Sequence, residues 1–293
     1  MIESVILQNK STLQSVLIDR EESDFVLGTL NLGTVTSTPH TYKYLNQIGV
    51  YVNSTTLEER EISLEGWVIG DTQDLLSQNK MVLNRLLNPL KMVILTVGAY
   101  QLEFLPKTSI SYSTDWQENN EVLCKFLIQG ICPNPLFSLA SEQTILLATT
   151  TPRFHFPWVI PEETGTIFGL REPSKLQEIN NTGDVPIGAI FTFTCTSNVV
   201  NPKILNINTQ EFLRIDKTIT PEETITISTV NGEKSIRGIL NGVESNYFSY
   251  WDLESTWLQL PVGLTPFKYD ADENPGGLEV SISFTPQYLE VQT

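Results

Sequence analysis

The stretch that decides the fold is REISLEGWVIG, residues 60–70, in which apolar and polar residues alternate. Ile62, Leu64 and Val68 occupy every second position, and charged or polar residues stand between them. Successive side chains of a β-strand point to opposite faces of a sheet. The period of two therefore predicts a strand with one face on a core and the other in water.

The same alternation recurs in the second half of the chain, at residues 191–195, 225–227 and 280–284. Strands that are apolar on one face only are typical of antiparallel sheets, because parallel strands are buried on both faces. From residue 176 onward the predicted strands recur at intervals of roughly eight to twelve residues, with turn sequences between them. This spacing predicts an antiparallel β-sandwich or barrel.

One segment has a helical period instead. Between Asp71 and Leu87, six leucines and valines lie on one face at spacings of three, four and seven. Either Asp71 or Thr72 caps the first turn, and Pro89 ends the segment. We therefore predict one helix over residues 71–87. The residues that follow predict a hairpin with strands 92–97 and 101–105.

The length of 293 residues fits two domains of ordinary size. Pro133 and Pro135 end a predicted strand, and residues 137–175 are less regular and rich in proline. We therefore predict an N-terminal domain over residues 1–136 and a C-terminal domain over residues 137–293.

The charge of the chain excludes two classes of partner. Lys and Arg total 18 against 34 Asp and Glu, which gives a net charge of −16. Stable binding to nucleic acid or to anionic lipid requires a basic surface, so neither is predicted. No signal peptide and no apolar stretch long enough for a membrane span is visible.

The three cysteines form no CxxC pair. Cys124 and Cys132 lie eight positions apart on one predicted strand, which places them on the same face but roughly 26 Å apart, beyond disulfide reach. A reducing compartment is the simpler interpretation, and we expect a soluble protein made in a cytoplasm.

The sequence predicts no catalytic, cofactor-binding or metal-binding residue, and hence no enzyme. His40 and His155 are the only histidines, and no Cys/His spacing resembles a zinc site. There is no GxSxG nucleophile motif and no phosphate-binding GxxxxGK loop. His155 is interpreted as a strand histidine with a satisfied ring, and we expect His40→Ala and His155→Ala to leave function intact.

Two groups of residues leave alternatives open. Adjacent carboxylates suggest a glycan hydrolase, but in turns they are interpreted as exposed surface; the pairs are Glu21-Glu22, Glu58-Glu59, Glu162-Glu163 and Glu222-Glu223. The aromatic sequence YFSYW, residues 247–251, followed by Trp257, is interpreted as a packed sandwich strand. Its alternative interpretation is a platform on which a sugar stacks.

Two regions of the chain resemble the distal tail proteins of long-tailed phages that infect Gram-positive bacteria. The first is the strand at 60–70, followed by the predicted helix and the LNP sequence at 87–89. The second is an ordered series of short sequences: EINNTGDVPIG (178–188), NPKILN (201–206), EFL (211–213), IST (227–229), STWLQLPVG (255–263) and TPQY (285–288).

This resemblance implies a mainly β protein with an N-terminal tail-tube-like β domain, one helix, and a C-terminal galectin-like antiparallel β-sandwich. It implies a structural virion protein that forms a homo-hexameric hub at the distal end of the tail, assembled in the host cytoplasm. The hub would join the tail tube protein to the baseplate and its tail-associated fibre or lysin protein. Receptor-binding or side-appendage proteins are further implied partners, and DNA would only pass through.

Two further expectations depend on the resemblance. Six acidic copies repel one another at low salt, so the ring is expected to form more readily as salt rises. Carboxylates among Glu58, Glu59, Glu61 and Glu65 are expected to line or flank the central hole.

Because the lectin histidine and arginine are absent, the galectin-like label implies no sugar binding. The alternative function is a carbohydrate-binding β-sandwich module acting in host-surface adhesion.

Overall fold

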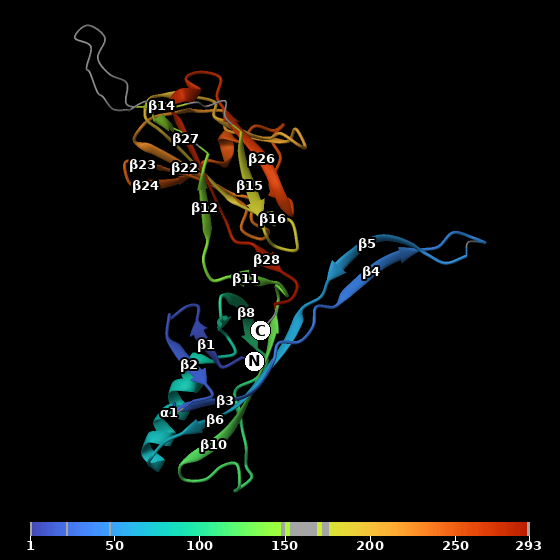
Figure 1. Ribbon diagram of the computed structural model, residues 1–293, viewed down its shortest axis with the longest axis vertical. Coiled ribbons are helices and arrows are strands. Elements are labelled where there is room, and N and C mark those ends of the chain that lie inside the picture. Colours follow the sequence, from blue (N-terminus) through green and yellow to red (C-terminus); the bar gives the residue numbers. More distant parts are fainter. Residues whose placement is uncertain are drawn as a thin grey trace. The chain divides into compact units, whose positions relative to one another are not determined.

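The computed structural model describes residues 2–21, 23–46, 48–147, 150–152, 169–171 and 176–291. The chain divides into two compact units (Figure 1): a first unit of Met1–Ala140 with Gln287–Thr293, and a second unit of Ser141–Pro286. The described part is mainly β and contains a single α-helix, as the sequence predicts.

This division differs from the predicted boundary after residue 136. The chain makes one more short strand in the first sheet, β11 (Phe137–Leu139), which pairs with residues 100–101 and buries Phe137. After the second unit the chain returns to add β28 (Gln287–Tyr288) beside β11. Pro133 and Pro135 thus end one strand of the first unit, but they do not end the unit.

The first unit is built on one ten-stranded sheet, in the order β28-β11-β8-β7-β1-β2-β3-β6-β10-β9. An additional pairing of β8 with β10 joins the two halves of the sheet. All strand pairs in it are antiparallel except β2 with β3. The remaining bounds are β1 Ser4–Asn9, β2 Ser15–Asp19, β3 Phe25–Asn31, β6 Arg60–Ile69, β7 Val93–Val97, β8 Tyr100–Pro106, β9 Ser111–Tyr112 and β10 Leu123–Cys132.

The local predictions for this unit are confirmed. The alternating stretch at 60–70 forms β6, and its apolar residues are buried in the core of the unit. The helix α1 runs from Gln73 to Leu86, and the backbone N–H of Leu75 donates to the Thr72 hydroxyl at 3.3 Å. Strands β7 and β8 form the predicted hairpin, whose turn contains Gly98 at φ +58°.

Both cysteines of β10 lie in this core as free thiols. Burial raises the pKa of the Cys132 thiol to about 12, although the nearby Arg60 charge acts in the opposite direction. A thiol with such a pKa stays protonated near neutral pH and is a poor nucleophile.

The second unit is a β-sandwich, as predicted. A six-stranded antiparallel sheet, β12-β27-β17-β22-β23-β24, and a four-stranded one, β15-β26-β19-β20, contribute to one core. The first sheet has β12 Gln143–Leu146, β17 Ile190–Cys195, β22 Glu223–Ser228, β23 Ser235–Leu240, β24 Val243–Asn246 and β27 Leu278–Phe284. The second sheet has β15 Gln177–Asn181, β19 Lys203–Asn206, β20 Phe212–Arg214 and β26 Gly263–Asp270.

Short elements complete the second unit. Its two-stranded sheets are β13-β14, β16-β25 and β18-β21. Their bounds are Thr150–Pro152 and Gly169–Arg171, Ile187–Gly188 and Gln259–Leu260, and Val199–Val200 and Thr218–Ile219. The 3-10 helices are η1 Phe248–Tyr250 and η2 Pro275–Gly277.

The interpretation of residues 247–251 as a strand is wrong. Strand β24 ends at Asn246, and the next residues turn into η1. The Asn246 carboxamide oxygen accepts a hydrogen bond from the backbone N–H of Phe248 at 2.9 Å. This local side-chain bond competes with the sheet ladder and ends the strand.

Candidate functional site

A long hairpin of β4 (Ser37–Tyr42) and β5 (Tyr51–Leu57), here called the arm, leaves the first unit between β3 and β6 (Figure 1). Every residue of both strands is exposed. The two strands pair only with each other. A two-stranded hairpin without a packed face is marginally stable by itself in water, so the arm needs a surface to lie on.

The tip of the arm is apolar. Leu45 is 97% exposed and Ile48 is fully exposed. The rings of Tyr42 and Tyr51 stack at 5.5 Å between centroids, and Tyr44 meets Tyr42 edge-on at 5.3 Å. Exposed apolar side chains gathered in this way mark a contact surface for another protein. His40, whose replacement by alanine is expected to leave function intact, also lies on the arm. Its Nε2 is 3.2 Å from Thr56 Oγ1.

The base of the arm is anchored by Arg60, whose side chain is fully buried. Its Nη1 donates to the carbonyl oxygens of Leu32 and Gly33, at 3.3 and 3.4 Å, just before the arm begins. The guanidinium group therefore fixes the point from which β4 leaves the sheet.

The same guanidinium group also binds two segments of the first unit that are far apart in the sequence, around Pro135 and Leu289. Arg60 Nε donates to the Pro135 carbonyl at 2.9 Å, and its Nη2 donates to the Leu289 carbonyl at 2.5 Å. Glu290 pairs with Nη2 at 3.4 Å, and the Phe137 ring centroid is 4.5 Å from the guanidinium carbon. A buried charge is tolerated because nearly every donor has an acceptor.

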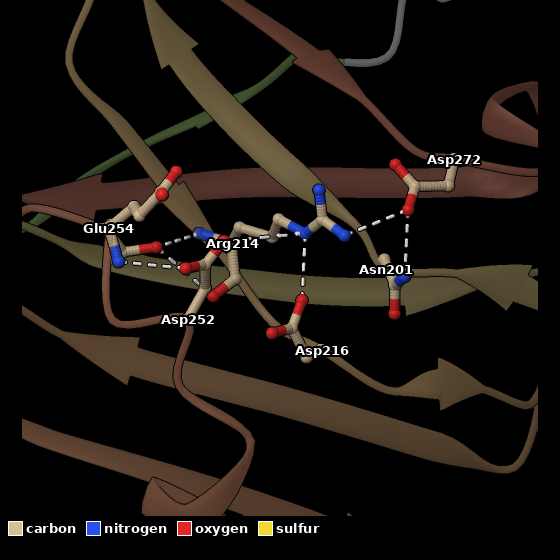
Figure 2. Close-up of polar contacts among 7 residues, drawn as sticks. Asn201, Arg214, Asp216, Asp252, Glu254 and Asp272 are labelled. Atoms are coloured by element: carbon tan, nitrogen blue, oxygen red, sulfur yellow. Dashed lines mark hydrogen bonds and ion pairs between the residues drawn. The ribbon is translucent and has the colours of Figure 1, made fainter.

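In the second unit an Arg214 network holds the loop that carries the aromatic residues (Figure 2). Arg214 Nε is 2.9 Å from Asp216 Oδ1, and its Nη2 is 3.0 Å from Asp272 Oδ2. Asn201 Nδ2 donates to the same Asp272 oxygen at 2.8 Å. Burial lowers the pKa of Arg214, but the hydrogen bond to Asp216 and the surrounding carboxylates outweigh it, so the net pKa is raised.

The network reaches the aromatic loop, residues 247–257, through Asp252 and Ser255. Asp252 Oδ2 lies 3.6 Å from Arg214 Nε, and the Arg214 backbone N–H donates to the Ser255 hydroxyl at 2.9 Å. Between these anchors, Trp251 stacks on Trp257 at 4.5 Å between ring centroids. The loop is thus held to β20 by charges and to the core by its tryptophans.

One predicted surface carboxylate is buried. Glu222 is exposed as expected, but Glu223 is only 1% exposed. Lys217 Nζ lies 2.7 Å from both Glu223 oxygens, and the Tyr247 hydroxyl donates to the same carboxylate. The turn interpretation fails for Glu223 because it begins β22 and faces inward, where Lys217 neutralises it.

The Tyr247 hydroxyl makes the stability of this cluster depend on pH in the alkaline range. Its hydrogen bond to Glu223, with burial and the nearby negative charge, raises the pKa of Tyr247 from 10 to about 12. Because the folded state holds this proton more tightly than the unfolded chain, its stabilising effect is complete below pH 10 and is lost as pH rises through 12. Tyr247→Phe is therefore expected to flatten the fall of the urea midpoint between pH 10 and 12.

Tyr250→Phe is the matched control, because Tyr250 lies three residues away and is more exposed. It should follow the parent protein across the same pH series. An equally steep fall in the Tyr247→Phe variant would contradict the assignment.

The other sequence-predicted candidates do not converge on a site. Glu21, Glu58 and Glu59 are exposed, whereas His155, Glu162-Glu163 and Glu22 lie outside the described residues. Among the described residues, no group of three or more His, Cys, Asp or Glu side chains is placed to hold a metal ion. None of the described helices has the length and apolar composition that crossing a membrane requires.

Comparison with known proteins explains this architecture. Residues 182–288 match the family model of the siphovirus-type tail component, C-terminal domain. Comparison with curated protein sequences gives no match. Among solved structures, the chain is similar to the Dit (gp 19.1) protein of phage SPP1, described as a paradigm of the hub adsorption apparatus in phages that infect Gram-positive bacteria. The identity is 14%, over 97% of this chain and 98% of that one, with a TM-score of 0.67.

The chain is also similar to a chain of the phage P2 baseplate in its activated conformation. With Ca the identity is 11%, over 97% of this chain and 98% of that chain, with a TM-score of 0.56. With Sr the identity is 12% at the same coverage, with a TM-score of 0.54. These likenesses show a shared fold, and the family match covers nearly the same residues as the second region of resemblance in the sequence. Residues 182–288 therefore match the siphovirus-type tail component domain, and the chain as a whole shares the fold of the Dit hub protein.

Proposed function

We propose that this chain is a structural hub that assembles into a ring of six copies and joins the tail tube to the baseplate. The observation that carries the proposal is the arm, whose exposed apolar tip needs a surface to cover it. We assign the next copy of the chain as the occupant: a projecting element that docks on the same site of each next copy generates a ring where the rotation between copies closes. The resemblance to distal tail proteins supports the number six.

Arg60 supports the same interpretation. An arm that reaches a neighbouring subunit must leave its own sheet in a fixed direction. The buried guanidinium group provides this by binding the backbone of Leu32 and Gly33. The arm is therefore a pre-positioned element, which lowers the conformational entropy lost when it docks.

The charges suit a conduit for DNA. Glu61 pairs with Lys107 and Glu65 pairs with Lys125, whereas Glu58 and Glu59 have no ion pair within the described part of the chain. We therefore assign Glu58 and Glu59, at the base of the arm, to the rim of the central hole. Unpaired carboxylates there repel phosphates and keep passing DNA from binding.

The proposed role involves no catalysis and no cofactor. The tail tube protein is the partner on one side of the ring, and the tail-associated fibre or lysin protein is the partner on the other. Receptor-binding or side-appendage proteins would attach through the second unit, outside the ring.

Negative-stain microscopy of the full-length protein tests the ring directly. Sixfold views with a central hole are expected, with a mass of six chains by mass photometry. Raising the salt from 20 to 300 mM should increase the ring fraction, because the Debye length falls below about 10 Å and the acidic subunits no longer repel one another. A monomer at every salt and protein concentration, or a ring that dissociates as salt rises, would contradict the proposal.

A further inference from the structure

We propose that the second unit carries a groove for an acidic saccharide, beside the edge strand β24. The groove has a volume of about 430 Å³, and its chemistry comes from Lys234, Arg237, Glu244, Ser245, Asn246 and Phe248. All of these residues belong to the second unit, so the inference does not depend on ring formation.

The apolar part of the groove is the ring of Phe248, which is 55% exposed. Phe248 is backed by Trp257 at 6.3 Å between ring centroids, and Trp257 in turn stacks on Trp251. The Arg214 network fixes the loop that carries these rings. An exposed aromatic ring on a rigid support is the surface on which the apolar C–H face of a sugar ring packs.

The polar part of the groove is an array of planar donors and acceptors. Arg237 Nη1 and Glu244 Oε1 form an exposed ion pair at 2.9 Å. The Asn246 oxygen is occupied by the Phe248 backbone N–H. Within the described part of the chain, neither the Asn246 amide nitrogen nor the Ser245 hydroxyl has a hydrogen-bond partner. Guanidinium, carboxylate and amide groups around one apolar ring match the adjacent hydroxyls of a saccharide.

The charge of the groove selects among saccharides. Lys234 lies with its Nζ 5.4 Å from the Trp257 ring centroid and makes no ion pair within the described residues. The groove therefore holds two cations and one carboxylate, in a chain whose net charge is −16. A local positive site on an acidic protein attracts a ligand that carries a carboxylate or a phosphate. This groove does not use the absent lectin residues, so the missing lectin motif does not argue against it.

The test measures the binding of three probes to the full-length protein, by calorimetry and by tryptophan fluorescence. Tetragalacturonate carries carboxylates, a phosphorylated mannose pentasaccharide carries phosphate, and maltotetraose is the neutral match. We expect one or both acidic probes to bind at least about fivefold tighter than maltotetraose, with the preference falling as salt rises. Which acidic probe binds better distinguishes carboxylate from phosphate recognition.

Three variants make the result specific to the groove. Phe248→Ala should weaken binding at least about tenfold, because the stacking ring is lost. Lys234→Gln should weaken binding of the acidic probes more than binding of maltotetraose, and so reduce the preference for acidic probes. Leu253→Ala is the matched control, since this exposed residue lies in the same loop but outside the groove.

Each remaining outcome overturns the proposal. Absence of binding to all three probes would show that the groove takes no saccharide. Binding that survives Phe248→Ala, or that Leu253→Ala reduces equally, would place the sugar elsewhere. The ring fraction of every variant is measured alongside, so that failure of the groove is distinguished from failure of the hub assignment.

Discussion

Replacing Arg60 with methionine should lower the free energy of unfolding of the first unit by about 3 kcal/mol, because several buried backbone acceptors lose their donor. Methionine fills much of the same volume but donates no hydrogen bond. Four backbone carbonyls, those of Leu32, Gly33, Pro135 and Leu289, would lose the donor that now reaches them. An acceptor that stays buried without a partner costs about 1–3 kcal/mol.

The measurement is hydrogen–deuterium exchange of the β6 amides under native conditions, because the two units need not unfold together. Protection should fall in β6, β11 and β28 and stay unchanged in the second unit. Arg85→Met is the matched control: it removes a charge from an exposed residue in the last turn of α1 and should cost less than about 1 kcal/mol. Equal protection in Arg60→Met and the parent protein would show that the carbonyls find other donors.

A related variant tests what residues 287–293 contribute to the first unit. Deleting residues 287–293 removes β28 and the Leu289 and Glu290 acceptors of Arg60. If Arg60 is the link between these segments, the deletion and Arg60→Met combined should cost less than the sum of the two changes. Additive costs would mean that the segment stabilises the first unit through other contacts.

Local periodicity explains which parts of the fold were predictable. Strand β6, the helix at 73–86 and the β7–β8 hairpin carry signals that lie within about ten residues of one another. The burial of Arg60 was readable in the same pattern, because it stands two positions before Ile62 on the buried face of β6. An arginine on a core face indicates a buried acceptor set, although the sequence does not say which carbonyls supply it.

The features that were not predicted from the sequence are of two kinds. Some depend on contacts with residues far away in the chain, and one, the arm, makes no packing contact that leaves a pattern. β28 is two residues long and pairs with a strand about 150 positions earlier, so no alternating pattern of apolar and polar residues predicts it. Glu223 is buried because Lys217 and Tyr247 reach it from separate loops. The arm has no buried face and therefore no period-two pattern, so its existence was visible only in the structure.

The arm gives the second large prediction, that Leu45→Ser combined with Ile48→Ser abolishes the ring. Burying a leucine or isoleucine side chain contributes about 1.5–3 kcal/mol. Losing two such contacts at each interface should therefore weaken association at least about 100-fold. The fold of each subunit should be unchanged, because both side chains are almost fully exposed in the single chain.

Mass photometry and sedimentation velocity at equal concentration measure this effect, with circular dichroism as the check on folding. Leu253→Ser is the matched control, since Leu253 is 95% exposed but lies in the second unit. It should leave the ring intact although it removes the same kind of exposed apolar group. If the double variant assembles with the parent's concentration dependence, the arm tip is not part of the subunit interface. The apolar tip would then be left to bind a different protein, and the ring would have to close through the sheet surfaces of the first unit.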